Sequence, residues 1–205
     1  MLIERAPKLY RNLYQGSHWR INPNEKSVYL TFDDGPIPEI TPWVLDLLDK
    51  YNIKATFFCV GDNVKNHPDI FRMVQERGHK IGNHTFHHIK ALKTDTQSYL
   101  KEVEDAACLI KSKLFRPPYG HMFFSQFKAL RKQYKVIMWD VVTRDYSRLM
   151  TAEQVFEVVK KYTRNGSIIV FHDSLKAGDR MKESLPKSIE WLLEQGYNFR
   201  VIEEI

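Results

Sequence analysis

Hydrophobic and polar positions follow two different periods along this chain. Short runs rich in Val, Ile, Phe and Tyr predict strands. About seven such runs occur, at 27–32, 54–60, 80–83, 114–116, 135–139, 167–172 and 199–202. Between them, apolar residues recur at helical spacing, as at Val155, Val158, Val159 and Tyr162. The pattern therefore predicts strands and helices that alternate from residue 27 to the end.

The ends of the predicted helices carry their own signals. Pro42 and Pro68 stand where the first turn of a helix accepts proline. Thr151 with Gln154 resembles a capping box, and glycines such as Gly78 follow helical runs and stop them. These signals divide the chain into regular units of strand and helix.

Regular alternation favours parallel strands joined by helical crossovers, either in a barrel or in a doubly wound sheet. About seven strands in 205 residues predict a compact (β/α) barrel, complete or incomplete, with helices outside it. Residues 1–26 form a polar, aromatic-dotted lead-in that we expect to pack on the barrel. Since no repeat or linker interrupts the chain, the sequence predicts a single domain over residues 1–205.

Composition excludes several classes of protein. A content of 43% hydrophobic and 13% aromatic residues is typical of a globular chain. Lys and Arg exceed Asp and Glu by 31 to 25, but the excess is spread out, so no nucleic-acid partner is predicted. No apolar run approaches the roughly 20 residues of a membrane helix, and Met1-Leu2-Ile3 is too short for a signal-peptide core. We therefore expect a cytoplasmic protein without a membrane partner.

The unusual polar residues fall where the predicted strands end. In a parallel α/β fold these carboxyl ends share one face, where sites are built. The residues concerned are Asp33 and Asp34 after the first strand, His84, His87 and His88 after the third, Arg116 and Tyr119 after the fourth, Trp139, Asp140 and Asp145 after the fifth, and His172 and Asp173 after the sixth.

Two of these groups suggest a metal site. His84 and His88 stand four residues apart, which would put both imidazoles on one face of a helical turn and let them bind one ion. His84 with His87 is a competing pair, and spacing alone does not choose between them. Asp33 and Asp34 would diverge at a strand end, one toward a metal and the other toward a water, although two acids before Gly-Pro also suit a simple turn.

Taken together, four segments resemble motifs of one family. They are Thr31-Phe32-Asp33-Asp34-Gly35-Pro36, His84-Thr85-x-x-His88, Arg116-x-Pro118-Tyr119 and, as a variant of Leu-x-His, Val170-Phe171-His172. Over residues 26–202 the chain resembles the polysaccharide deacetylase family, the carbohydrate esterases of family 4 that share the NodB-homology domain. This resemblance selects His88 rather than His87 as the partner of His84.

One motif departs from the family pattern. Where the family has Asp-x-x-Asp-Trp, this chain has Val142, Asp145 and Tyr146 at the three defining positions. The acid that the family places beside its catalytic histidine, Asp145, is kept. We expect the exchanges at Val142 and Tyr146 to change the shape of the substrate pocket more than the chemistry.

The resemblance implies a metal-dependent hydrolase that removes an N-linked acetyl group from an amino sugar. The substrate would be a chitooligosaccharide, a peptidoglycan-type strand or a related glycan, attacked by a metal-bound water. One divalent ion is implied, Zn²⁺ with Co²⁺ or Ni²⁺ as alternatives, held by Asp34, His84 and His88. Such an enzyme hydrolyses carbon–nitrogen bonds other than peptide bonds.

The remaining parts of the implied site also have residues to fill them. Amide hydrolysis needs a base, a place for negative charge on the carbonyl oxygen and a proton for the departing amine. The resemblance implies the base Asp33 oriented by Arg116, the acid His172 beside Asp145, an oxyanion contact from the backbone N–H of Tyr119, and apolar faces from Trp139 and Phe171.

Three alternatives stay open at this point. Two histidines and a carboxylate also bind iron(II) in oxygenases, although Asp33, Arg116 and His172 favour hydrolysis. A hydrolase of the same fold could act on a non-sugar amide or a cyclic imide. A non-catalytic carbohydrate-binding protein is the third reading, and the intact acids and histidines argue against it.

Overall fold

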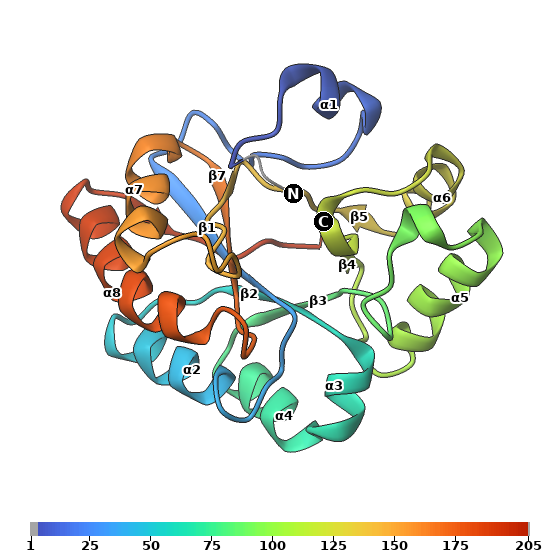
Figure 1. The fold of residues 1–205 in the computed structure, drawn as a ribbon, viewed down its shortest axis with the longest axis horizontal. Coiled ribbons are helices and arrows are strands. Elements are labelled where there is room, and N and C mark those ends of the chain that lie inside the picture. Colours follow the sequence, from blue (N-terminus) through green and yellow to red (C-terminus); the bar gives the residue numbers. More distant parts are fainter. Residues whose placement is uncertain (1–3, 205) are drawn as a thin grey trace.

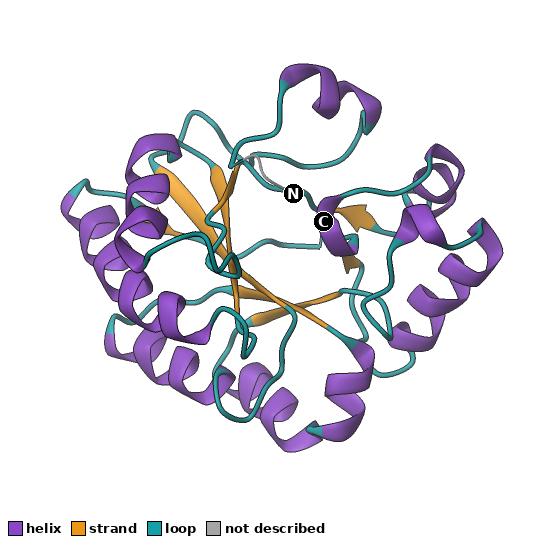
Figure 2. Ribbon diagram, viewed as in Figure 1, coloured by secondary structure: helices purple, strands orange, loops and turns teal. Residues whose placement is uncertain are grey.

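Parallel strands form the centre of the computed structural model, which describes residues 4–204 (Figures 1 and 2). Every paired strand runs parallel to its neighbour. The strands are β1 (Ser27–Asp33), β2 (Thr56–Cys59), β3 (Lys80–Asn83), β4 (Leu114–Phe115), β5 (Lys135–Val136), β6 (Val141–Val142), β7 (Ser167–His172) and β8 (Asn198–Phe199).

The sheet curls into an incomplete barrel. Its order is β5-β4-β3-β2-β1-β7-β6, and β8 pairs with the beginning of β1. The two outermost strands of this order, β5 and β6, follow each other in the chain with only residues 137–140 between them. A single extended segment therefore pairs first with β4 and then with β7, and so connects the two edges of the sheet.

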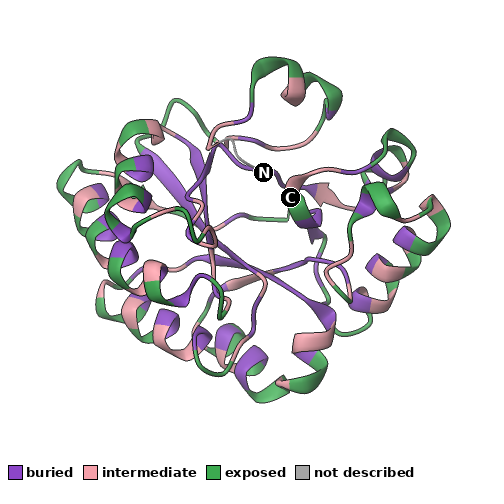
Figure 3. Cartoon of the chain, viewed as in Figure 1, coloured by how far each residue is buried: buried purple, intermediate pink, exposed green. Residues whose placement is uncertain are grey.

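Helices surround the strands on the outside (Figure 1). They are α2 (Thr41–Lys50), α3 (Gly61–Asn66), α4 (Pro68–Glu76), α5 (Thr96–Ala107), α6 (Phe124–Leu130), α7 (Ala152–Tyr162) and α8 (Gly178–Glu194), with the short 3₁₀ turns η1 (Ala91–Lys93) and η2 (Pro118–Gly120). Their outward faces are exposed while the strands are buried (Figure 3). The incomplete (β/α) barrel predicted from alternation is confirmed.

Strand alternation separates an outer core from the barrel interior. In β1, Leu30 and Phe32 pack with the surrounding helices, whereas Tyr29 faces inward. The inward layer is apolar at its base and consists of Tyr29, Phe58, Leu114, Ile137, Ile168 and Ile202. The polar residues at the carboxyl ends of the strands thus stand above a filled floor rather than over an open channel.

The lead-in packs against the barrel, as expected for the part that the structure describes; residues 1–3 lie outside the described residues. It contains a short helix, α1 (Lys8–Leu13), which lies at the open side of the ring of helices (Figure 1). His18 forms a bridge with Ile137, and Arg20 forms one with Ser167 at the start of β7. The lead-in therefore spans the opening of the barrel.

Most local predictions agree with the structure, and two strands do not; the last, predicted at 199–202, forms only as β8 (Asn198–Phe199). Pro42 and Pro68 lie in first helical turns, and Thr151 with Gln154 forms a capping box. The strand predicted at 135–139 is wrong in extent, because the segment changes partner from β4 to β7 and divides into β5 and β6. Within residues 4–204, no helix is both long enough and apolar enough to cross a membrane.

Candidate active site

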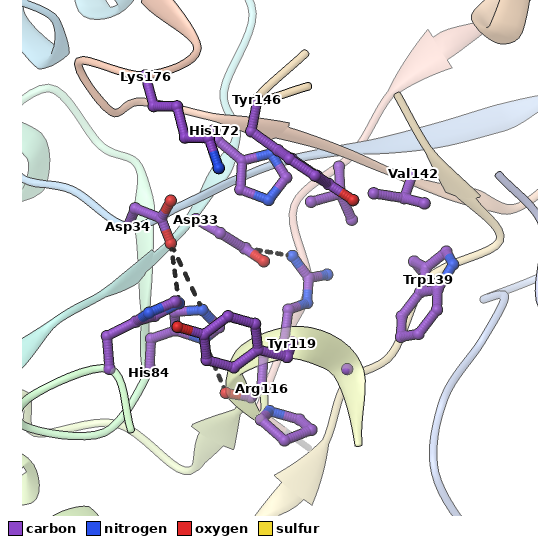
Figure 4. Close-up of a pocket in the computed structure, with 14 residues that line it drawn as sticks. Asp33, Asp34, His84, Arg116, Tyr119, Trp139, Val142, Tyr146, His172 and Lys176 are labelled. Carbon is purple, nitrogen blue, oxygen red and sulfur yellow. Dashed lines mark hydrogen bonds and ion pairs between the residues drawn. The ribbon is translucent and has the colours of Figure 1, made fainter. Parts of the chain in front are cut away.

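A pocket of about 440 Å³ opens at the carboxyl ends of the strands. Figure 4 shows Asp34 and His84 on one side of it, Trp139 and Val142 on the other, and Asp33 with Arg116 between them. The residues that line it are Asp33, Asp34, His84, His88, Arg116, Pro117, Tyr119, Gly120, Trp139, Val142, Tyr146, Val170, His172 and Lys176. Of the ten site residues that the sequence suggests, all but Asp145 and Phe171 line this pocket.

The turn after β1 separates the two adjacent acids. Asp34 has a left-handed backbone with φ of 85°, which turns its side chain away from that of Asp33. Gly35 follows because the carboxylate of Asp173 lies where a Cβ atom would be, 2.0 Å from its Oδ2. Asp173 in turn accepts hydrogen bonds from the Gly35 N–H at 3.1 Å and the Thr41 hydroxyl at 2.6 Å. The buried Asp173 thereby holds the turn in place.

Two histidines face Asp34 from the loop after β3. The Asp34 Oδ1 lies 3.2 Å from the His88 Nε2 and 3.8 Å from the His84 Nε2. One ligand atom from each of the three residues falls within 4.8 Å of the others. The prediction that a helical turn aligns the histidines is wrong, since the segment is an irregular loop with left-handed Thr85 and His88.

His87 points elsewhere. Its Nδ1 lies 2.8 Å from Glu102, and its side chain is 59% exposed. Within the described residues it therefore belongs to a surface pair and not to the group around Asp34.

Hydrogen bonding and burial suit the histidines and Asp34 for holding a cation. The His84 Nδ1 lies 2.8 Å from the Arg116 carbonyl oxygen and so donates to it, which leaves Nε2 with a free lone pair toward Asp34. Burial lowers the pKa of His84 to about 4, so this ring is neutral at pH 7. Burial alone would raise the pKa of Asp34, but the hydrogen bond from His88 and the nearby histidines outweigh it and lower that pKa.

Asp33 forms a buried ion pair with Arg116. The Arg116 Nη1 donates to the Asp33 Oδ1 at 2.5 Å, and both side chains are less than 10% exposed. Arg116 also donates to the Thr31 hydroxyl and the Met138 carbonyl, and its guanidinium stacks on the ring of Phe58 at 4.0 Å. These contacts fix one oxygen of Asp33 and leave the side chain at the pocket wall.

His172 ends β7 beside Asp33, its register partner on β1, and is held by Asp145. The Asp145 carboxylate accepts from the His172 Nδ1–H at 2.8 Å and from the His172 backbone N–H at 2.7 Å. Burial alone would lower the pKa of His172, but Asp145 and the more distant Asp34 and Asp33 raise it to about 9. The imidazolium form of His172 therefore persists through neutral pH.

The structure corrects one residue that was predicted to line the pocket, Phe171, and adds Val170 and Lys176 to the lining. Phe171 is fully buried in the outer core against Phe32, because strand alternation turns it away from the pocket. Val170, which shares the inward face of β7 with His172, lines the pocket instead. The same period of two in the sequence would have identified Val170. Sequence reasoning gave no role to Lys176 or Asp173.

Comparison with known proteins gives a consistent family. A family model described as polysaccharide deacetylase matches residues 20–137. A peptidoglycan-N-acetylglucosamine deacetylase of Bacillus cereus is 33% identical over 195 residues, which cover 91% of this chain and 91% of the relative.

Two solved structures extend the likeness to the fold. A crystal structure of a peptidoglycan N-acetylglucosamine deacetylase bound to an N-hydroxybenzamide compound matches with a TM-score of 0.89 and 30% identity, covering 96% of this chain and 95% of that one. A pseudoenzyme of carbohydrate esterase family 4 from Bacillus anthracis matches with a TM-score of 0.81 and 27% identity, covering 90% of this chain and 66% of that longer one.

Proposed function

This chain belongs to the polysaccharide deacetylase family, and from that membership we propose that it is a metal-dependent hydrolase that removes the N-linked acetyl group from an amino sugar of a glycan. The observation that carries the proposal is the meeting of three groups in one pocket. These are the cation-binding group of Asp34, His84 and His88, the Asp33–Arg116 pair and the His172–Asp145 pair.

The residues present fit one divalent transition-metal ion, with Zn²⁺ first and Co²⁺ or Ni²⁺ as alternatives. Asp34, His84 and His88 would hold it, since a carboxylate and two neutral imidazoles are a common donor set for these ions. The hydrogen bond from His84 to the Arg116 carbonyl supports this assignment because it presents Nε2 to the cation. When bound, such an ion acidifies a coordinated water and polarises the amide carbonyl.

Asp33 is the proposed base that takes the proton of the attacking water. Its position beside the cation-binding group, its ion pair with Arg116 and its place at the pocket wall support this role. Arg116 orients the carboxylate, because it offers a charge-assisted hydrogen bond to one oxygen.

His172 is the proposed acid that gives a proton to the departing amine. It lines the same pocket on the strand next to Asp33, and Asp145 stabilises its charged form. Proton donation to the amine is the step that an imidazolium can perform and a neutral imidazole cannot.

The remaining lining residues suit the two ends of an acetamido sugar. We assign the backbone N–H of Tyr119 to the carbonyl oxygen, where charge develops in the transition state. Trp139, Val142 and Val170 form an apolar wall for the acetyl methyl group. The half-exposed rings of Tyr119 and Tyr146 stand at the pocket, where a pyranose ring could stack.

Released acetate tests this function directly. The metal-loaded protein is incubated with acetylated chitooligosaccharides, peptidoglycan fragments and non-sugar amides, and we expect acetate from the sugar amides with the higher specificity constant. A clear preference for an imide or an acyl peptide would move the function to the non-sugar alternative. No acetate from any substrate would favour a non-catalytic binding protein.

Metal content tests the site itself. We expect about one divalent ion per chain by elemental analysis and its loss in His84→Ala and His88→Ala, because each variant removes one of three ligands. His87→Ala is the matched control, since its ring is paired with Glu102 on the surface. Retained metal after the loss of His88 would refute this ligand set.

A further inference from the structure

The N-terminal segment, defined here as residues 4–20, contacts the pocket wall from behind. The family match begins at residue 20, so this segment precedes the region that the family model describes. Its side chains and backbone nevertheless reach η2, Trp139 and β6, which all contribute residues to the pocket.

The most direct contact is made by Tyr10 on α1. Its hydroxyl donates a hydrogen bond of 2.7 Å to the carbonyl oxygen of Gly120, the residue after Tyr119. The neighbouring Tyr14 binds both backbone groups of Met122, accepting from its N–H at 3.0 Å and donating to its carbonyl at 2.8 Å. Two tyrosines of one segment thus hold the backbone on the C-terminal side of Tyr119.

The turn that these tyrosines hold contains a backbone conformation that is unfavourable for Tyr119. Tyr119 has φ of 61° and Gly120 has φ of 74°, two successive left-handed residues. This conformation costs a residue with a side chain roughly 1–2 kcal/mol. The Gly120 N–H donates to the Pro117 carbonyl at 3.0 Å, which fixes one side of the turn. Tyr10 fixes the Gly120 carbonyl on the other side.

The N-terminal segment is bonded to the barrel at several points, so the position of Tyr10 relative to the pocket is fixed. Arg11, one residue after Tyr10, donates to the fully buried Asp140 at 2.9 Å. The Glu4 carbonyl accepts from the Val142 N–H at 2.8 Å, which joins the segment to β6. The ring of Tyr10 packs against those of Trp19 and Trp139, at centroid distances of 6.0 and 6.5 Å.

We propose that Tyr10 is a positioning residue for the reaction, which holds the left-handed turn so that the Tyr119 N–H meets the carbonyl oxygen of the substrate. This inference rests on the proposed function, in which the Tyr119 N–H receives developing negative charge. Tyr10 itself does not line the pocket, so it acts through the Gly120 carbonyl.

Loss of the hydroxyl should lower turnover and leave substrate affinity unchanged. Removing an oxyanion donor outright costs about 10²- to 10³-fold in kcat, and a donor that is displaced but present costs less. For Tyr10→Phe we expect kcat to fall about tenfold with KM within about twofold. The phenyl ring keeps its packing against Trp19 and Trp139, so bound metal and Tm should match the parent protein.

The test pairs kinetics with hydrogen exchange in the metal-free protein. Tyr10→Phe should speed amide exchange in residues 119–122, because the turn that holds the Gly120 N–H on the Pro117 carbonyl is no longer fixed. Leu9→Ala is the matched control, since Leu9 lies on the same helix with 78% exposure and should change neither exchange nor kcat.

Each outcome decides the inference. Unchanged exchange in Tyr10→Phe, unchanged kcat, or an equal loss in Leu9→Ala would overturn it, as would a loss seen in KM alone. If the parent protein releases no acetate, the proposed function fails separately. The exchange measurement then still shows whether Tyr10 fixes the turn.

Discussion

Two buried aspartates at opposite ends of the sheet have very different surroundings. Asp33 closes β1 at the carboxyl end and has one cationic partner, Arg116, on one of its oxygens. Asp140 lies beside the amino end of β7, where Ser167 and Arg164 donate to it. Arg11 also donates to it, and Arg5 and Arg20 lie 3.8 Å away.

The difference matches the two roles proposed for these acids, a base at the pocket and a structural anchor. Both oxygens of Asp140 are occupied by donors, and its side chain is fully buried and does not line the pocket at the carboxyl ends of the strands. Burial alone would raise the pKa of Asp140, but hydrogen bonds from Arg164, Arg11 and Ser167 outweigh it and lower that pKa. Asp33 instead stands at a pocket wall, where the structure gives Arg116 as the donor to one of its oxygens.

The largest expected effect comes from neutralising Asp33. Asp33→Asn should keep the metal and lose about 10²- to 10⁴-fold in kcat, because a general base is removed. Asp34→Asn is the contrasting variant. Excess metal should partly restore its turnover, because this variant loses a metal ligand. Turnover against added zinc or cobalt, with bound metal measured in parallel, distinguishes the two. Restoration of Asp33→Asn by metal would mean that the roles are reversed.

Neutralising Asp140 should reduce stability and leave the chemistry nearly intact. Asp140→Asn leaves four guanidinium groups without their shared counter-charge. We expect a loss of about 2–3 kcal/mol in the free energy of unfolding, below the roughly 3–5 kcal/mol of a fully buried pair because the arginines are 20–40% exposed. Urea unfolding of the parent protein and of Asp140→Asn measures this difference in the free energy of unfolding. A kcat lower than that of Tyr10→Phe would show that Asp140 does more than anchor the chain.

The acid dependence of that stability has a definite sign. The folded pKa of Asp140 lies below its unfolded value, so its contribution is present above the unfolded pKa of about 3.9 and is lost as pH falls through the folded pKa. The stability difference between the parent protein and Asp140→Asn should therefore shrink below about pH 4. A difference that persists at pH 2 would assign the loss to packing rather than to charge.

Asp145 combines both kinds of behaviour, because it is buried and saturated like Asp140 but acts on His172 in the pocket. Asp145→Asn removes the charge that raises the His172 pKa to about 9, so that pKa should fall. Since the acid must be protonated, the alkaline limb of kcat should move to lower pH by about one unit or more. The pH profile of kcat at constant bound metal is the measurement, and an unmoved limb would exclude His172 as the acid.

The smallest expected effect concerns Val142, where the family has an acid. Val142 lies in the apolar wall with Trp139 and Val170, while Asp145 remains paired with His172. Val142→Asp should therefore leave turnover within about threefold, less than 0.7 kcal/mol of barrier. A tenfold rise, about 1.4 kcal/mol, would show that the missing acid limits the chemistry.

Local patterns in the sequence determined the succession of strands and helices and the end of the sheet at which most of the polar residues gather. Asp140 is the exception, because it precedes β6 and lies beside the amino end of β7 instead. They succeeded because helix caps, proline positions and the periods of strand and helix act within a few residues, as the Thr151–Gln154 box does. The family motifs added the choice of His88 over His87, which spacing alone could not make.

Tertiary structure alone decided how these groups meet. The bonds from Tyr10 to Gly120 and from Arg11 to Asp140 join residues 110 and 129 positions apart. The bond from Arg116 to Asp33 spans 83 positions, and only the family resemblance had implied it. No local pattern encodes such pairs, because they depend on the barrel bringing strand ends and the lead-in together. The division of 135–142 into β5 and β6 has the same origin, since it follows from a change of neighbouring strand and not from the residues themselves.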